Sequence, residues 1–97
     1  MIKHIVCFKL HDNSVEEKNK VRDLLLSMEG KVPTVKKIEV GCDFLNSQRS
    51  YDVILQVWLE NKNALDEYQN DNYHVTVVKE YMHKTADASI AVDYEIE

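Results

Sequence analysis

Three side chains that can move protons near neutral pH stand out in this chain: two histidines and a tyrosine. His4 lies in the first apolar run, whereas Tyr68 and His74 lie close to each other far downstream. A neutral imidazole can take a proton next to a carbonyl, and a phenol or a second imidazole can polarise the oxygen or return the proton. If the fold brings His4, Tyr68 and His74 together, they form a small proton-transfer pocket. If it does not, they are two isolated histidines and a core tyrosine.

Other kinds of chemistry lack a sequence pattern. Cys7 and Cys42 fit no metal spacing, and no His-x-x-x-His, Cys-x-x-Cys or Asp-x-Asp-x-Asp string occurs. The chain has only two glycines, so no glycine-rich loop can cradle a phosphate. Asp87 and Asp93 do not lie at a spacing that suggests acid–base partners. We therefore expect no metal and no cofactor.

Length and charge narrow the class of protein. The 97 residues fit one domain over 1–97, with a single shallow core. A net charge of −5 with scattered basic residues argues against nucleic acid. No apolar stretch approaches the roughly 18 residues that span a membrane, and no signal-peptide cleavage site is present. Two cysteines without an export signal suggest reduced thiols and a cytoplasmic location.

Hydrophobic periodicity places the three residues on elements. Residues 2–10 alternate as a strand with His4 on the apolar side, and a Ser14–Glu17 capping box starts a helix that Gly30 ends. Strands follow at 35–43 and 50–59. Asn61 can cap a helix that carries Tyr68, and Asp71 or Asn72 can cap another that carries His74. Residues 88–96 form the last strand.

The element order β-α-β-β-α-α-β predicts an α+β, ferredoxin-like fold, a four-stranded antiparallel sheet with helices on one face. The apolar side of each strand should lie beneath the helices, and in the last strand this side holds Ile90, Val92, Tyr94 and Ile96. The opposite face should then carry Ile5, Cys7, Ile54, Trp58 and Ala91 among Lys3, Lys9, Gln56 and Asp93. A face this apolar is typical of an interface, so we expect a homodimer through the sheet face that carries Trp58, with a barrel-like centre.

The chain resembles a known family, the stress-responsive dimeric α+β barrel domain called Dabb. The matching segments are Lys3–Lys9, Val40–Asp43, Tyr51–Leu55, Tyr68 with His74, and Val92–Tyr94. The resemblance spans nearly the whole chain and implies a dimeric α+β barrel. Most members of that family have no assigned reaction. The resemblance to this family implies a homodimeric barrel protein of unassigned activity that binds a small organic ligand between the sheet and the helices.

One branch of the family resembles a plant polyketide cyclase that closes a ring by aldol condensation. Its pocket residues match His4, Tyr68 and His74 as the catalytic set here. The family commonly has a His-Pro-x-His string where this chain has Asp71-Asn72-Tyr73-His74, and the cyclase has a further histidine where this chain has Val53. The alternatives are therefore a cyclase-like acid–base enzyme, a non-catalytic stress protein, and a cofactor-independent or haem-degrading monooxygenase of the same barrel type.

Overall fold

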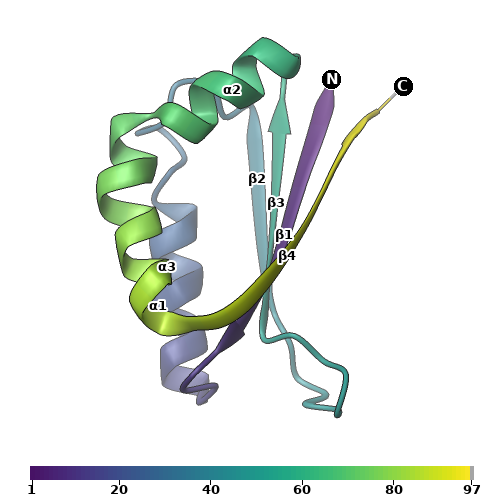
Figure 1. Cartoon of the computed structure of the whole chain (residues 1–97), viewed down its shortest axis with the longest axis vertical. Coiled ribbons are helices and arrows are strands. Elements are labelled where there is room, and N and C mark those ends of the chain that lie inside the picture. Colours follow the sequence, from purple (N-terminus) through teal and green to yellow (C-terminus); the bar gives the residue numbers. More distant parts are fainter. Residues whose placement is uncertain (97) are drawn as a thin grey trace.

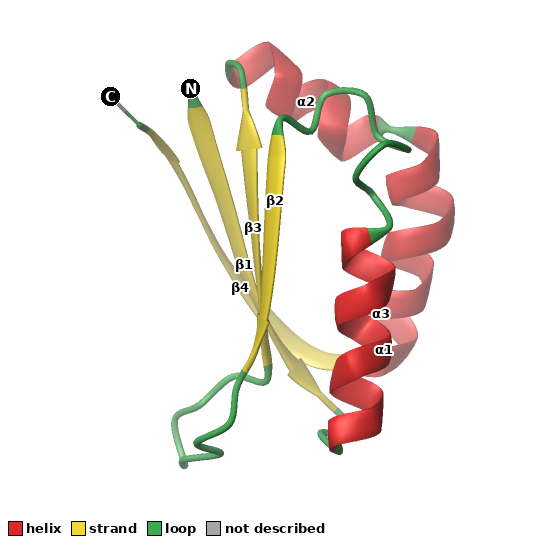
Figure 2. Ribbon diagram, turned by 180° about the vertical axis from the view of Figure 1, so that it is seen from behind, coloured by secondary structure: helices red, strands yellow, loops and turns green. Residues whose placement is uncertain are grey.

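Four antiparallel strands form one sheet, and the helices cover one side of it in the computed structural model, which describes residues 1–96 (Figures 1 and 2). The strand order is β2-β3-β1-β4. The strands are β1 (Ile2–Leu10), β2 (Lys37–Cys42), β3 (Val53–Leu59) and β4 (Ala86–Glu95). The helices are α1 (Val15–Leu26), α2 (Lys62–Asn70), the π-helical segment η1 (His74–Lys79) and α3 (Glu80–Thr85), which continues from η1. The predicted fold class and element order are confirmed.

The first helix begins at Ser14, as its sequence predicts. The Ser14 hydroxyl accepts a hydrogen bond from the Glu17 backbone N–H at 3.2 Å, which satisfies one of the free amides of the first turn. The second half of the predicted capping box is wrong. Asp12 takes the Ser14 N–H at 2.9 Å, and the Glu17 carboxylate instead accepts from the Tyr81 hydroxyl at 2.8 Å. Glu17 therefore ties α1 to α3.

The two predicted caps around the site are also present. The Asn61 side chain accepts from the Ala64 N–H at 2.8 Å and starts α2. The Asp71 carboxylate accepts from the N–H groups of Tyr73 and His74, at 2.9 and 3.2 Å. These bonds replace helical partners that the first turn lacks. They fix where the chain turns from α2 into η1, and thus where His74 lies.

The core lies between the helices and the inner face of the sheet. In β3, Val53, Leu55, Val57 and Leu59 are buried, in the alternation that the sequence predicts. In β1, His4 lies opposite Val57 of β3, so its side chain shares that inner face. The helical layer contributes Val21, Leu25, Tyr68, Val78 and Met82, and the turn after α1 contributes Met28.

The predicted orientation of β4 is wrong. Ile90 and Val92 lie opposite Cys7 and Ile5, so they share the open face, away from the helices. Ile90, Val92 and Tyr94 keep 52%, 58% and 44% of their surface exposed. Ala91 and Asp93, which we expected on the open face, lie on the inner side instead. The periodicity identified which residues share a face, but the register with β1 decides which face is covered.

The open face combines apolar and basic side chains. Trp58 lies between two lysines, with the Nζ atoms of Lys3 and Lys37 each 4.7 Å from the centre of its ring.

Cys7 belongs to this face, whereas the Cys42 thiol contacts the Lys18 carbonyl under α1, and both thiols are free. In the described part of the chain, no helix has the length and apolar character needed to cross a membrane.

Candidate functional site

A cavity of about 430 Å³ lies between the inner face of β1 and β4 and the helical layer of α2, η1 and α3. This volume is within the range of roughly 300 to 1,000 Å³ that is typical of small-molecule sites. The cavity exists because the side chains that the edge strand β4 contributes to its wall are small, namely those of Ser89 and Ala91. The remaining lining residues are His4, Val6, Phe8, Leu25, Leu55, Tyr68, Gln69, His74, Val78, Lys79, Met82 and His83.

The structure brings the three residues singled out in the sequence together around one aromatic ring. Tyr68 is fully buried, and His74 stacks on it with ring centres 4.4 Å apart and planes 28° apart. His4 meets the same ring edge-on at 5.4 Å, with an interplanar angle of 64°. Strand β1 therefore supplies one imidazole, η1 supplies the other, and α2 supplies the ring between them.

The hydroxyl of Tyr68 does not lie at the rim of the cavity. It donates to the Met28 sulfur at 3.7 Å, inside the core. Burial raises the pKa of Tyr68 well above its ordinary value, and the negative charge of Asp93 raises it further. Tyr68 therefore contributes its ring to the site, while its proton is held in the core.

His74 is a neutral base with one free nitrogen. Its Nδ1 lies 3.0 Å from the Tyr68 carbonyl oxygen, and because a carbonyl only accepts, Nδ1 carries the hydrogen. Nε2 then holds a lone pair, and within residues 1–96 no protein hydrogen bond reaches it. Burial lowers the pKa of His74, and the charges of Lys79 and His4 lower it further, against an opposing effect of the Tyr68 carbonyl. The ring is therefore uncharged at neutral pH.

His4 is held in place by Asp93, a partner that the sequence did not reveal. The two residues lie directly opposite each other on β1 and β4, and the His4 Nδ1 pairs with the Asp93 carboxylate. The spacing of Asp87 and Asp93 in the sequence suggested no acid–base partner for either residue; in the structure Asp87 pairs with His11 at the exposed far end of these strands. The carboxylate accepts from Nδ1, and within residues 1–96 no protein hydrogen bond reaches the other ring nitrogen of His4, Nε2.

His74 can accept a hydrogen bond or a proton through Nε2, and His4 lines the same cavity beside an apolar wall. A molecule with a carbonyl or an ionisable C–H next to it would meet both functions there. Among residues 1–96, no three His, Cys, Asp or Glu side chains cluster closely enough to hold a metal ion.

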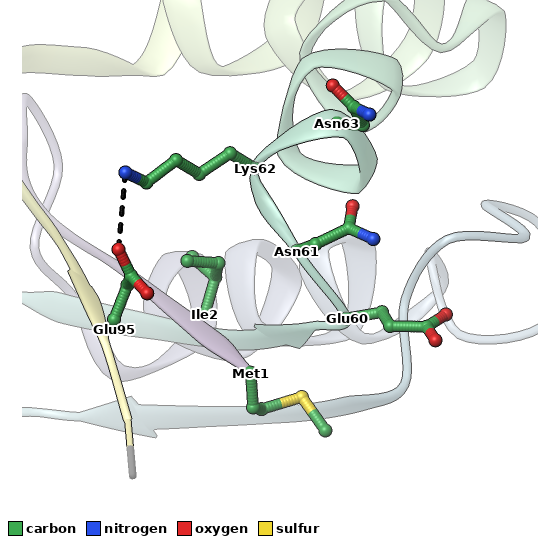
Figure 3. Close-up of a pocket in the computed structure, with 7 residues that line it drawn as sticks. All are labelled: Met1, Ile2, Glu60, Asn61, Lys62, Asn63 and Glu95. Carbon is green, nitrogen blue, oxygen red and sulfur yellow. Dashed lines mark ion pairs between the residues drawn. The ribbon is translucent and has the colours of Figure 1, made fainter.

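A second hollow, of about 390 Å³, opens where the ends of β1, β3 and β4 meet the start of α2 (Figure 3). Its lining is mostly polar and includes an ion pair between Lys62 and Glu95, whose charged atoms lie 3.2 Å apart. Both side chains are largely exposed. Exposed pairs of this kind contribute little, and the hollow contains no imidazole, so we place no site there.

Residues 2–96 match the family described as the Stress responsive A/B Barrel Domain, Dabb, and the chain therefore belongs to that family. The chain has no significant match among curated proteins. A solved structure from Bacteroides fragilis, a dimeric protein of unknown function with a ferredoxin-like fold, is 30% identical; the comparison covers 98% of this chain and 95% of that one, with a TM-score of 0.79.

Two more distant structures share the fold. The Arabidopsis thaliana protein At3g17210 is 21% identical, with a TM-score of 0.85 over 100% of this chain and 96% of that one. A protein described as an antibiotic biosynthesis monooxygenase is 13% identical, with a TM-score of 0.74 over 100% of this chain and 99% of that one. At these identities the similarity extends to the fold alone.

Proposed function

We propose that this protein is a homodimer in which each subunit binds a small organic molecule between the sheet and the helices. The observation that carries the proposal is the Nε2 of His74, which has no hydrogen-bond partner in the described part of the chain while its ring lines a largely apolar cavity. Ligand sites typically combine an apolar wall with a few placed polar groups. His4, fixed by Asp93, is the second such group.

The dimer would form through the open sheet face that carries Trp58. Ile90, Val92 and Tyr94 extend that face along β4 and are half-exposed in the single subunit. Exposed apolar surfaces of this kind usually mark interfaces, and the Bacteroides fragilis relative is described as dimeric. The ligand cavities lie on the other side of each sheet, so the two subunits would carry independent sites. With a net charge of −5 and two free thiols, we place the dimer in the cytoplasm, without a nucleic-acid partner.

A second candidate function is acid–base catalysis in the same cavity. His74, neutral and with Nε2 free, would take a proton next to a carbonyl, and His4 would polarise the oxygen or return the proton. Such assistance contributes about 10² to 10⁴ in rate. Tyr68 would position both imidazoles through its ring, because its hydroxyl is bound to Met28.

A monooxygenase is the remaining alternative, favoured by the fold shared with the antibiotic biosynthesis monooxygenase. A haem titration separates its haem-degrading form from the other candidates. A haem-binding protein would shift the Soret band at one haem per subunit, whereas a protein without a haem site would leave it unchanged.

Thermal-shift screening with small carbonyl compounds tests the ligand proposal. A ligand at 100 times its Kd stabilises the folded state by about 2.7 kcal/mol, which raises the Tm of a domain of this size by roughly 10 °C or more. His74→Gln should abolish the shift. His11→Gln is the matched control, since His11 is exposed and lies outside the cavity. Hits that stabilise the His74→Gln protein as much as the wild type would refute the site.

A further inference from the structure

The polar groups of the cavity are arranged by depth. The floor is apolar, with Leu25 fully buried and Leu55 and Val78 each 2% exposed. Lys79 follows Val78 in the chain and is half-buried, and His83, one turn further along α3, is exposed. Both line the same cavity. A ligand would therefore meet an apolar floor and a rim that carries a cation.

The sign of the lining charge is one-sided. No Asp or Glu lines the cavity within the described chain, and Lys79 is the one Lys or Arg side chain in this lining. The Asp93 carboxylate on β4 is already paired with His4. An acidic ligand group at this rim would therefore meet no opposing carboxylate in the lining.

In the described part of the chain, the Lys79 ammonium group is held by one hydrogen bond, which uses one of its three donors. Its Nζ donates to the Gln69 backbone carbonyl at 3.3 Å, a long bond to an uncharged acceptor. An ammonium group has three donors, so two remain. Within residues 1–96 no acidic side chain lies within ion-pair distance of Lys79, whereas the other lysine of this helical segment, Lys84, pairs with Glu80 at 3.8 Å. The positive charge of Lys79 also reaches into the site, where it helps to lower the pKa of His74.

We propose that the ligand of this cavity is an organic acid, with its apolar body on the floor of Leu25, Leu55 and Val78 and its carboxylate at the rim against Lys79. The inference rests on the proposed ligand site and adds the charge of the ligand. The overall charge of the protein, −5, would by itself repel an anion. A preference for anions would therefore have to come from the local arrangement.

Three probes of equal chain length separate the effect of the ligand's charge on binding from the effect of its apolar chain: octanoate, 1-octanol and octylammonium. Each is titrated at pH 7 and followed by ¹H–¹⁵N NMR. We expect octanoate to bind at least tenfold more tightly than the other two. Lys79→Met, which keeps the apolar stem, should reduce that preference to less than threefold, and Lys79→Arg should keep it. Lys84→Met is the matched control with the same change in net charge, and it should behave as the wild type.

Each outcome decides something different. If 1-octanol binds as tightly as octanoate, the acid preference is wrong and the cavity remains a ligand site. If Lys79→Met keeps the full preference, the assignment of the charge to Lys79 is wrong. If none of the three probes shifts the resonances of the lining residues, the ligand site itself is refuted, and the organic-acid inference fails with it.

Discussion

Val92→Glu should dissociate the proposed dimer without unfolding the subunit. Val92 lies on β4, on the open face, with 58% of its surface exposed in the single chain. An exposed β4 position tolerates a polar side chain in the monomer, so the folded subunit should keep nearly its full stability. In a two-fold dimer the substitution occurs twice, once on each side of the interface.

The expected loss follows from burial. Full burial of a valine side chain contributes about 1.5 to 3 kcal/mol, so covering the exposed part of Val92 contributes roughly 1 kcal/mol per subunit. Burying a carboxylate costs several kcal/mol more, which Lys3 on the same face can offset only in part. A total of about 4 kcal/mol would raise the Kd of the dimer by roughly three orders of magnitude.

Sedimentation equilibrium over a range of concentrations measures this directly. Val15→Glu is the control, because Val15 is 70% exposed at the start of α1, on the helix side of the sheet. We expect Val15→Glu to sediment as the wild-type dimer and Val92→Glu to sediment as a folded monomer with native circular dichroism. A Val92→Glu protein that remains as dimeric as the control would refute the placement of the interface on the open face.

Three further predictions concern the interior. Burial lowers the pKa of His74 in the folded protein, so the unfolded chain takes up the His74 proton first as the pH falls. The difference in the free energy of unfolding between the wild type and His74→Gln should therefore shrink below about pH 6.5, by at most about 1.4 kcal/mol per pH unit. Urea unfolding at several pH values measures this difference, and parallel curves for the two proteins would contradict the prediction. Tyr68→Phe should lower the free energy of unfolding by no more than about 1 kcal/mol, since within residues 1–96 the hydroxyl bonds only to the Met28 sulfur, whereas Tyr68→Ala should lower it by about 3 to 5 kcal/mol. Similar losses for the two variants in thermal unfolding would show that the hydroxyl is structural. Asp52→Ala should lower the free energy of unfolding by about 1 to 3 kcal/mol, because the buried Asp52 carboxylate accepts a hydrogen bond from the Leu10 N–H at 2.7 Å. An unchanged denaturation midpoint would mean that water replaces the carboxylate as the partner of that N–H.

Alternation in the sequence predicted most of the sheet. In β1 and β3 the apolar side is also the covered side, so His4 was placed correctly beside the core. The same rule failed for β4, where Ile90 and Val92 lie on the open face and the covered side holds Ser89, Ala91 and Asp93. Period-two patterning identifies which residues share a face, and it places the apolar set inside only when the subunit alone must bury it. On β4 the small side chains on the inner face, Ser89 and Ala91, instead leave space that forms part of the cavity.

The site was predictable only in part. His4, Tyr68 and His74 were chosen because their types suit proton transfer and because the resemblance to the family places them together. The structure brings their three rings into contact. Asp93 was missed because its contact with His4 joins residues 89 positions apart, through a register that no local pattern encodes. The orientation of the Tyr68 hydroxyl toward Met28 depends on helix packing, which the sequence does not specify at the level of single atoms.

A crystal structure of the protein soaked with a ligand from the thermal-shift screen is the most direct measurement. We predict ligand density between β1 and η1, with a polar atom within hydrogen-bond distance of the His74 Nε2. Density confined to other surfaces, or a cavity closed by Phe8 and Met82 with no room for a molecule, would contradict the proposed site.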